Sequence, residues 1–578
     1  MAKRFAGLLG TLLITLLLAL STSACGGGSD ADPDGGVDLG VDAANGNGSN
    51  GNGNGSNGNG SGGSWEDPDC PTYHVRCDGE CIPAVSDPDN CGGCGITCEE
   101  GEFCSGGSCV SETDFSCPDF EDADIEVCGR RCVDTNWDNE NCGSCGRACP
   151  EGQGCVFGNC VEPLGTSDEI AGCEDGGPPI FFPPGEENGN GDGDADLCAG
   201  HVAETVFRFG LCSCNDIDLG QRIFVDGFVS SDGGYVPGAR GGSVGANANI
   251  STHTADETLT VTSVLWSSGD QITLRHNSTI GEELYCAGDL DTRQTVTVGQ
   301  HGFITGDINS TGSLEFGGTL HVSEETSFNE NTVSFDELIR DGDLEVREAC
   351  TECAPEDRLP IADLVAARAD ANDNDLIDLS SDALVGVTSD TRLDLPCGNY
   401  YLDGISASSG SNITIVAHGR TALYIDGDVQ TNSRIIIVPA EGAELDVLVA
   451  GDVSFAQLFT QIGSPNYPAM FRMYVGGEGG VTVNHRIGLG GFLYAVPGGY
   501  NQPSQRVRVF GGIYTENYVT GNQDTDITFD RRVLTIGEGC PDGSDRCVPL
   551  EGECETSADC CTPFQCFGGI CSEGVIID

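Results

Sequence analysis

A short strand motif that ends in Gly-Asp recurs along this chain and limits the folds it can adopt. The two closest copies are Leu423–Val429 and Val447–Val453, whose glycines lie 24 residues apart. Apolar residues alternate with other residues in each copy, which is typical of a β-strand, and Gly-Asp is typical of a turn. The unit returns at Ala287–Leu290, Thr305–Ile308 and Asp341–Leu344, with glycines 18 and then 36 residues apart.

Short strands with glycine corners at such intervals predict an all-β fold, a parallel β-solenoid (β-helix) in which each coil buries its inner face against the next. A flat β-sandwich is the alternative, although its strands would follow at shorter and more even spacing. The stretch from Cys350 to Asp378 interrupts the pattern, so we expect two lobes joined by a connector. Ile361 to Ala369 is expected to form a short helix within it.

The composition restricts the compartment and the partners. The chain has 91 acidic and 25 basic residues and a formal net charge of −66. This charge repels nucleic acid and anionic membrane surfaces, so we expect no nucleic-acid partner. Thirty-two cysteines are too many for a reducing cytosol and indicate an oxidising compartment.

The N-terminus has the features of an export signal. A basic start precedes an apolar run from Leu8 to Leu20, and small residues then lead to Cys25. A cysteine at this cleavage position resembles the signal of bacterial lipoproteins, with Thr22 where that family prefers leucine. The resemblance implies a lipidated Cys25 that anchors the chain to a membrane, and Gly26 after it implies the outer membrane or cell surface. An ordinary secretory signal is the alternative.

Two cysteine-rich repeats follow a Gly/Asn/Ser tether. From the second cysteine onward, both share spacings of 3, 9, 2, 3, 5 and 4 intervening residues. Such short polar segments cannot build a core, so we expect disulfides, with zinc binding as the alternative. The disulfide candidates are Cys70, Cys77, Cys81, Cys91, Cys94, Cys98, Cys104, Cys109, Cys117, Cys128, Cys132, Cys142, Cys145, Cys149, Cys155 and Cys160. The repeats resemble the cysteine-rich module of the plant stigma-specific protein family, which implies a binding or spacer module.

The tail adds six cysteines with one adjacent pair, a pattern that resembles knottin modules and implies a small disulfide-held cap or binder. These disulfide candidates are Cys547, Cys554, Cys560, Cys561, Cys566 and Cys571, whose pairing the sequence leaves open. Within the large body we expect staples from Cys212, Cys214, Cys286, Cys350, Cys353 and Cys397. With Cys25 lipidated, the count leaves an odd cysteine, so either at least one thiol is free or intermolecular, with Cys173 and Cys540 as our candidates, or Cys25 is not lipidated.

Two segments carry candidate calcium ligands. Asp192, Asp194 and Asp196 alternate with other residues in a glycine-rich stretch, as oxygen ligands do in calcium loops. Asp370, Asn372 and Asn374 form a second, similar run. Neither run has a bidentate Glu at its end, so an acidic linker explains the first segment better, and a cap on the adjacent helix explains the second better. We expect no cofactor and leave only calcium open.

The order of motifs from Asp394 to Ile536 resembles an uncharacterised β-helical domain of exported Gram-negative lipoproteins, which implies a fold but no activity. Solenoids also serve as polysaccharide lyases and hydrolases, which group carboxylates on one face. The candidates for such a site are Asp426, Asp428, Asp446, Asp452, His418, Arg420, His485 and Arg486. A turn role explains the recurring aspartates better, because a catalytic site would be a local exception. We therefore expect no enzyme.

The expected parts are a signal peptide (1–25), a disordered tether (26–65), two cysteine-rich repeats (66–110 and 111–161), an acidic linker (162–197), a first lobe (198–349), a connector (350–393), a second lobe (394–538) and a tail (539–578). The expected function is a non-enzymatic, lipid-anchored surface protein with a structural or adhesive role toward an envelope protein or an extracellular glycan. A carbohydrate-active enzyme is the first alternative, and an inhibitor or toxin-like role of the cysteine-rich ends is the second.

Overall fold

The computed structural model describes residues 125–540 with gaps at 129–130, 165–172, 174–175, 183–196, 220, 232–234, 236–237, 253–257, 456–459, 486, 503–505 and 521–523, and the segments 74–77, 80–83, 90, 94–98, 102–105, 108–111, 565–567 and 570–572. They all belong to one compact unit, Ser64–Asp578. Cys25, the tether, and Asp192, Asp194 and Asp196 lie outside the described residues.

The body is a parallel β-solenoid of about 12 turns, as predicted, and parallel pairing throughout its strands excludes the sandwich. The first lobe consists of β11 Leu211–Ser213, β12 Ile217–Leu219, β13 Ile223–Phe228, β14 Val244–Ala246, β15 Ile250–Thr252, β16 Leu259–Val261, β17 Leu265–Ser267, β18 Gln271–Leu274, β19 Ser278–Ile280, β20 Leu284–Cys286, β21 Asp289–Thr292, β22 Val296–Val298, β23 Gly302–Ile304, β24 Ile308–Ser310, β25 Leu314–Phe316, β26 Thr319–Val322, β27 Val333–Ser334 and β28 Glu337–Arg340.

The second lobe consists of β29 Thr391–Leu395, β30 Gly398–Leu402, β31 Ile405–Ala407, β32 Ile413–Ala417, β33 Arg420–Ile425, β34 Val429–Thr431, β35 Ile435–Pro439, β36 Glu444–Val449, β37 Val453–Phe455, β38 Thr460–Gly463, η4 Pro468–Met470, β39 Phe471–Val475, β40 Val481–Val483, β41 Ile487–Ala495, β42 Tyr500–Asn501, β43 Val507–Thr515, β44 Tyr518–Val519, β45 Thr525–Asp530 and η5 Arg531–Gly539. Helix α1 (Ala199–Val206) precedes the first lobe.

The two repeat intervals in the sequence each match the length of individual coils, one interval in each lobe. Leu290 of β21 pairs with Ile308 of β24, 18 residues later, and Val429 of β34 pairs with Val453 of β37, 24 residues later. Inward side chains of each coil are buried in one continuous apolar core. Each coil therefore stacks its own hydrophobic layer on the previous one, which is the main stabilising term of a solenoid.

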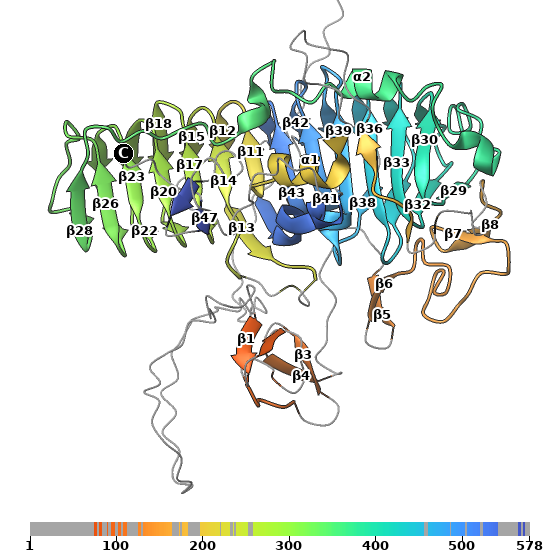
Figure 1. Cartoon of the computed structure of the whole chain (residues 1–578), viewed down its shortest axis with the longest axis horizontal. Coiled ribbons are helices and arrows are strands. Elements are labelled where there is room, and N and C mark those ends of the chain that lie inside the picture. The colour runs from red at the N-terminus through yellow and green to blue at the C-terminus, as the bar shows by residue number, and fades with distance from the viewer. Residues whose placement is uncertain are drawn as a thin grey trace, which may run out of the picture. The chain divides into compact units, whose positions relative to one another are not determined.

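The two lobes meet end to end at a junction that we call the seam. Strands β43, β44 and β45 of the last coil pair in parallel with β11, β12 and β13 of the first coil. The chain thus enters the solenoid in its middle, builds one lobe outward to β28, and returns to the opposite end at β29 (Figure 1). It then builds the second lobe back to the seam, so that one solenoid forms from two separately wound halves.

Residues 341–390, which we call the strap, make this return along the outside of the solenoid and contain η2 (Thr351–Cys353), α2 (Ile361–Ala366) and η3 (Asn374–Ile377) (Figure 1). The strap covers a row of outward aromatic side chains. Trp266, Tyr285 and Phe303 stack at ring-centroid distances of 4.4 and 4.8 Å, and Tyr494 stacks on Tyr514 at 5.4 Å. Strap residues packed in the same apolar cluster are Leu344, Val346, Ala349, Ile361, Leu364 and Val365.

The expected solenoid corner at Asp341–Leu344 is wrong. This segment begins the strap, and Leu344 is buried in the outer cluster rather than in the solenoid core. Before this segment, Ile308 of β24 forms a bridge to Phe328, 20 residues later, whereas β26 still pairs with β28 at the 18-residue interval. The regular step is therefore lost on one face of the solenoid first. The Gly-Asp pattern continues where the coil does not, because it is a signal for turns in general.

The cysteine-rich parts form short antiparallel hairpins. Their strands are β1 His74–Cys77, β2 Glu80–Pro83, β3 Glu102–Ser105, β4 Ser108–Ser111, β5 Ile125–Cys128, β6 Arg131–Asp134, β7 Gly154–Val156, β8 Asn159–Val161, β46 Gln565–Phe567 and β47 Ile570–Ser572; a further pair joins β9 Phe181–Phe182 to β10 Leu197–Cys198. None of the helices in the described part of the chain combines the length and apolar character needed to cross a membrane.

Candidate functional site

The aspartates at the solenoid corners bind the backbone of the neighbouring coil. Asp428 Oδ1 accepts a hydrogen bond from the Asp452 N–H at 3.0 Å, and Asp452 Oδ1 accepts one from the Gly479 N–H at 2.8 Å. In the first lobe, Asp289 Oδ1 accepts the Asp307 N–H at 2.8 Å. The same carboxylate-to-amide contact thus links successive corners in both lobes and satisfies amides that would otherwise lack a partner.

Asp446, by contrast, is not a corner residue. It lies within β36, and its carboxylate forms a bidentate pair with Arg472 of β39, with N–O distances of 2.6 and 2.7 Å. Both side chains are 1% exposed. The pair joins two adjacent coils on the outer face under the η4 segment, whose Ala469 carbonyl accepts a further hydrogen bond from Arg472. A buried pair of this kind fixes geometry and leaves no free carboxylate for catalysis.

The basic candidates also have local partners. His418 Nε2 lies 2.6 Å from Asp394 Oδ1, and Arg420 Nε lies 3.2 Å from Glu444 Oε1. Burial alone would raise the pKa of Asp394, but hydrogen bonding to His418 and the charge of Arg392 outweigh it, so this pKa is lowered. The structure does not assemble these groups with Asp426, which is exposed. The His485 carbonyl accepts a hydrogen bond from Gln502, and Arg486 lies outside the described residues.

The second set of calcium candidates closes the outer end of the second lobe. Asn374 pairs with the backbone of Tyr401 through both its amide oxygen and its amide nitrogen, at 2.9 and 2.8 Å. Asn372 Oδ1 accepts the Asn374 N–H at 3.2 Å, and its nitrogen donates to carbonyls at the end of α2. These contacts put Asn372 and Asn374 in the end cap, whereas Asp370 is exposed beside it. Calcium binding here stays a prediction.

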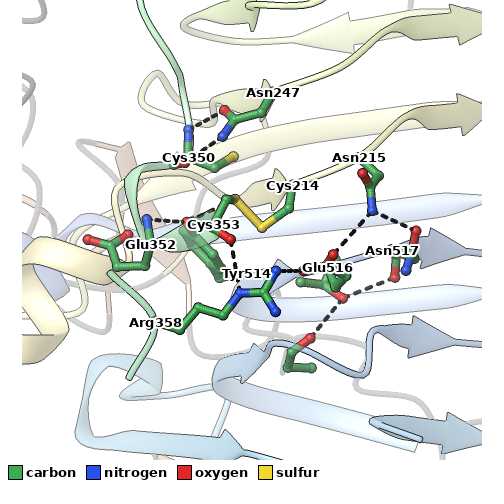
Figure 2. A network of polar contacts seen from close by, with 12 residues as sticks. Cys214, Asn215, Asn247, Cys350, Glu352, Cys353, Arg358, Tyr514, Glu516 and Asn517 are labelled. Atoms are coloured by element: carbon green, nitrogen blue, oxygen red, sulfur yellow. Dashed lines mark hydrogen bonds and ion pairs between the residues drawn. A yellow bond between two sulfur atoms is a disulfide. The ribbon is translucent and has the colours of Figure 1, made fainter. Parts of the chain in front are cut away.

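A polar network lies at the seam, where the strap crosses it (Figure 2). Tyr514 OH of β43 accepts the Glu352 N–H at 2.8 Å and lies 3.4 Å from Cys353 Sγ. Arg358 of the strap donates to Glu516 Oε2 at 2.8 Å and to the Cys353 carbonyl at 2.9 Å. Strap and second lobe are therefore tied by a charge-assisted contact, which is stronger than a neutral hydrogen bond.

The first lobe joins the same network through two asparagines. Asn215 Nδ2 donates to Asn517 Oδ1 at 3.0 Å and to Glu516 Oε1 at 3.5 Å. Asn247 exchanges two hydrogen bonds with the backbone of Cys350, at 2.6 and 2.8 Å. Because one network touches both lobes and the strap, we take this seam network as the candidate functional site of the body. Sequence reasoning missed it, since only the flanking cysteines gave a signal.

One carboxyl group of the seam network, that of Glu352, has a raised pKa. Burial raises the pKa of Glu352, and a hydrogen bond from the Thr351 hydroxyl at 2.8 Å opposes this only partly. Its second carboxylate oxygen, Oε2, is buried without a hydrogen-bond partner. Burial therefore favours the protonated form of Glu352 more than that of an exposed glutamate, which is a property that general acids use.

A second buried carboxyl group lies on the other side of the seam. Asp226 of β13 is fully buried, and its Oδ2 accepts hydrogen bonds from Tyr235 OH and the Gly238 N–H, both at 2.8 Å. Burial raises the pKa of Asp226 from 3.8 to about 6, although these hydrogen bonds oppose the shift. Through these two hydrogen bonds, Asp226 anchors Tyr235 and Gly238 of the segment between β13 and β14.

The disulfides confirm most of the expected staples. In the repeats, Cys77–Cys94 and Cys128–Cys145 occupy equivalent positions, which supports disulfides over zinc. The other described pairs are Cys142–Cys155, Cys149–Cys160, Cys173–Cys397, Cys198–Cys540, Cys212–Cys350 and Cys214–Cys353. The last two fasten the strap to the first coil beside the seam network.

Two cysteine expectations are wrong. Cys286 forms no disulfide, because it belongs to the inward-facing core of β20, with its sulfur 3.2 Å from the Gly288 carbonyl. Burial raises the pKa of its thiol to about 12, so it is unreactive. Cys173 and Cys540, expected as free thiols, are both paired.

The second cysteine-rich repeat is fixed to the solenoid through Arg392. This side chain is 1% exposed and donates to the carbonyls of Trp137 and Cys155, at 3.0 and 2.6 Å, while Asp394 balances its charge. A side chain at Gly154 would lie 2.3 Å from Arg392 Nε, so only glycine fits there. Repeat 2 is therefore part of one body with the second lobe.

Repeat 1 lacks the residues that make this contact. Trp137 and Phe157 of repeat 2 pack on an apolar patch formed by Val416, Ile436 and Val438. At the positions 51 residues earlier, repeat 1 has Ser86, Phe103 and Gly106 in place of Trp137, Gly154 and Phe157. The sequence of repeat 1 therefore does not carry the three residues that repeat 2 uses in this contact.

Comparison with protein families gives two matches. Residues 341–536 match a domain of unknown function, DUF7305, which is similar to the strap and second lobe together. Residues 62–112 and 115–174 match the stigma-specific STIG1-like protein family, as the cysteine spacings predict. No curated protein and no solved structure matches the chain.

The raised pKa of Asp226 predicts how stability depends on pH. The folded state holds this proton more tightly than the unfolded state, so the contribution of Asp226 to stability is fully present below pH 3.8 and is lost as pH rises to about 6. Asp226→Asn keeps the acceptor for Tyr235 and removes the ionisation. We expect its free energy of unfolding, relative to wild type, to rise by up to about 3 kcal/mol between pH 4 and 7 in urea titrations. The exposed Asp218→Asn variant is the control, and equal slopes for both variants would contradict the assignment.

Proposed function

We propose that this chain is a non-enzymatic, lipid-anchored protein of the bacterial outer membrane or cell surface that presents a rigid acidic solenoid to a partner. The observation that carries the proposal is the use of the recurring aspartates. Asp428 and Asp452 bind amides of the next coil, so their repetition serves the architecture. The partner is an envelope protein or an extracellular glycan.

The rigid attachment of the described modules supports a presenting role. Repeat 2 is held by the buried Arg392, and the strap is held by Cys212–Cys350 and Cys214–Cys353. Repeat 1, without the docking residues, and the low-complexity segment before it would then separate the solenoid from the membrane. A Gly/Ser-type tether of about 40 residues has an r.m.s. reach of roughly 35 Å.

The cysteine count supports a lipid on Cys25. Of the nine cysteines outside the repeats, the tail and Cys25, eight form four disulfides and Cys286 stays free. The repeats contain 16 cysteines and the tail cluster contains 6, both even numbers. If these pair among themselves, the thiol that remains for Cys25 is that of Cys286, which is buried in the solenoid core and cannot reach it. Cys25 is then left for the lipid.

A lipid at Cys25 predicts incorporation of a labelled fatty acid during expression in a Gram-negative host. The wild-type chain is expected to carry the label and to partition with membranes, and Cys25→Ser is expected to lose both. Cys286→Ser, which removes the buried free thiol instead, is the matched control and should keep the label. Fatty-acid label on the Cys25→Ser chain would contradict the assignment of Cys25 as the lipidated residue.

The alternative function is a carbohydrate-active enzyme, and one observation favours it. Glu352, with its raised pKa and unpaired Oε2, lies in the same network as Tyr514, Arg358 and Glu516 (Figure 2). Two carboxyl groups, one of them with a raised pKa, are the groups that glycoside hydrolysis uses. We rank this alternative second, because Arg358 and Glu516 already neutralise each other.

The exported chain from residue 26 onward, exposed to neutral and acidic polysaccharides, separates these functions. We expect either binding without turnover or no binding, and no new reducing or unsaturated ends. Glu352→Gln keeps the shape of the network and removes its acid, and Asp428→Asn alters one corner as the control. Cleavage that Glu352→Gln abolishes and Asp428→Asn preserves would replace the adhesive proposal with the enzymatic one. Absence of binding would leave a protein partner.

A further inference from the structure

The two ends of the solenoid chain meet at a cluster that contains more than a disulfide. Cys198 is the residue before α1, His201 lies in the first turn of that helix, and Cys540 follows η5. The Cys198–Cys540 bond joins residues 342 positions apart. Helix α1 packs closely on η5, because a side chain at Gly537 would come within 2.5 Å of the His201 ring.

The ligand atoms of Cys198, His201 and Cys540 all lie within 4.8 Å of one another. Two sulfurs and an imidazole nitrogen are typical zinc ligands, and in a tetrahedral site such atoms lie about 3.3–3.8 Å apart. Cys198 and His201 are three residues apart at the start of one helix, so they face the same side. Only a small separation of the two sulfurs would be needed to admit an ion.

Two other groups among the described residues place three such ligand atoms together, and neither offers the same chemistry. Cys142, Cys149 and Cys160 belong to two different disulfides, so reduction of one bond does not free the set. Glu126, Cys128 and Cys145 lack an imidazole. The cluster at α1 is therefore the described group in which a single reduction releases two thiols beside a histidine.

We propose that the Cys198–Cys540 pair is a redox-dependent zinc site. A dithiol reductant gives two electrons and two protons to the disulfide, which breaks into two thiols, and the reductant itself becomes a disulfide. Zinc then replaces the two thiol protons and binds both thiolates and the His201 nitrogen, with water as the fourth ligand. The N-terminus of α1 favours the Cys198 thiolate, because the helix dipole stabilises negative charge there.

The zinc form would keep α1 and η5 together when the disulfide is open. Both elements pack in the outer cluster of the second lobe, where Phe207 contacts Tyr474 and Phe492 at ring-centroid distances of 5.8 and 5.1 Å. Reduction alone would leave this corner joined by such packing and by the hydrogen bond that the Gly537 N–H donates to Glu204 Oε1 at 2.6 Å. Zinc binding substitutes one crosslink for another, so the closure of the chain survives a change in redox conditions.

The test compares cysteine alkylation with and without zinc. The exported chain from residue 26 onward is treated with limiting phosphine reductant, then with zinc chloride or buffer, and then with iodoacetamide. Peptide mass spectrometry measures the alkylation of Cys198 and Cys540. The Cys173–Cys397 pair is the internal control, because it belongs to none of the described groups of three ligand atoms. We expect zinc to protect Cys198 and Cys540 selectively and His201→Ala to lose this protection.

His201→Ala and the more conservative His201→Gln are both first shown to form the Cys198–Cys540 bond under oxidising conditions, which verifies that the corner folds. If a variant forms this bond but zinc no longer protects its Cys198 and Cys540 from alkylation, the result supports zinc ligation by His201. Protection of all four cysteines alike would mean an adventitious ion only. That outcome, unchanged protection in the variants, or no protection in wild type would overturn the proposal.

Discussion

The rest of the structure depends on the backbone ladder at the seam. The Ile513 N–H donates to the Gly210 carbonyl at 2.9 Å, and the Thr525 N–H donates to the Arg222 carbonyl at 2.9 Å. These bonds remove the exposed strand edges that two separate lobes would each present, and such edges promote aggregation. The strap and the seam network lie across this junction, so their contacts to both lobes depend on the closed ladder.

The length of a coil can be predicted from the sequence, but the order in which the coils stack cannot. A turn signal such as Gly427-Asp428 is local, so its recurrence predicts strand length, coil length and the solenoid itself. The seam depends on pairing between distant residues, for example the contact of Asn215 with Asn517, 302 positions apart. The repeat interval alone does not determine which two coils are neighbours at the seam. The disulfide expected for Cys286 is wrong for a related reason. Its side chain points into the core because of the register of β20, which the sequence does not reveal.

The candidate site shows the same division between local and non-local information. Sequence reasoning identified aspartates by their repetition, and the structure gives Asp428 and Asp452 an architectural contact. The groups with perturbed acidity, Glu352 and Asp226, occur singly and carry no motif. Their character comes from burial at the seam, which only the packing of the strap and the two lobes creates. A solenoid built in this way is well suited to present its surface as one rigid body.

Hydrogen–deuterium exchange of the seam amides tests most directly whether the two lobes form one solenoid. The account predicts that the amides of Ile513 and Thr525 are protected as strongly as that of Val453, which is bonded within the second lobe. Val519, exposed on β44, provides a reference peptide at the surface of the same coil. Exchange of Ile513 and Thr525 at the rate of free strand edges, with Val453 still protected, would show two independent lobes and contradict the account.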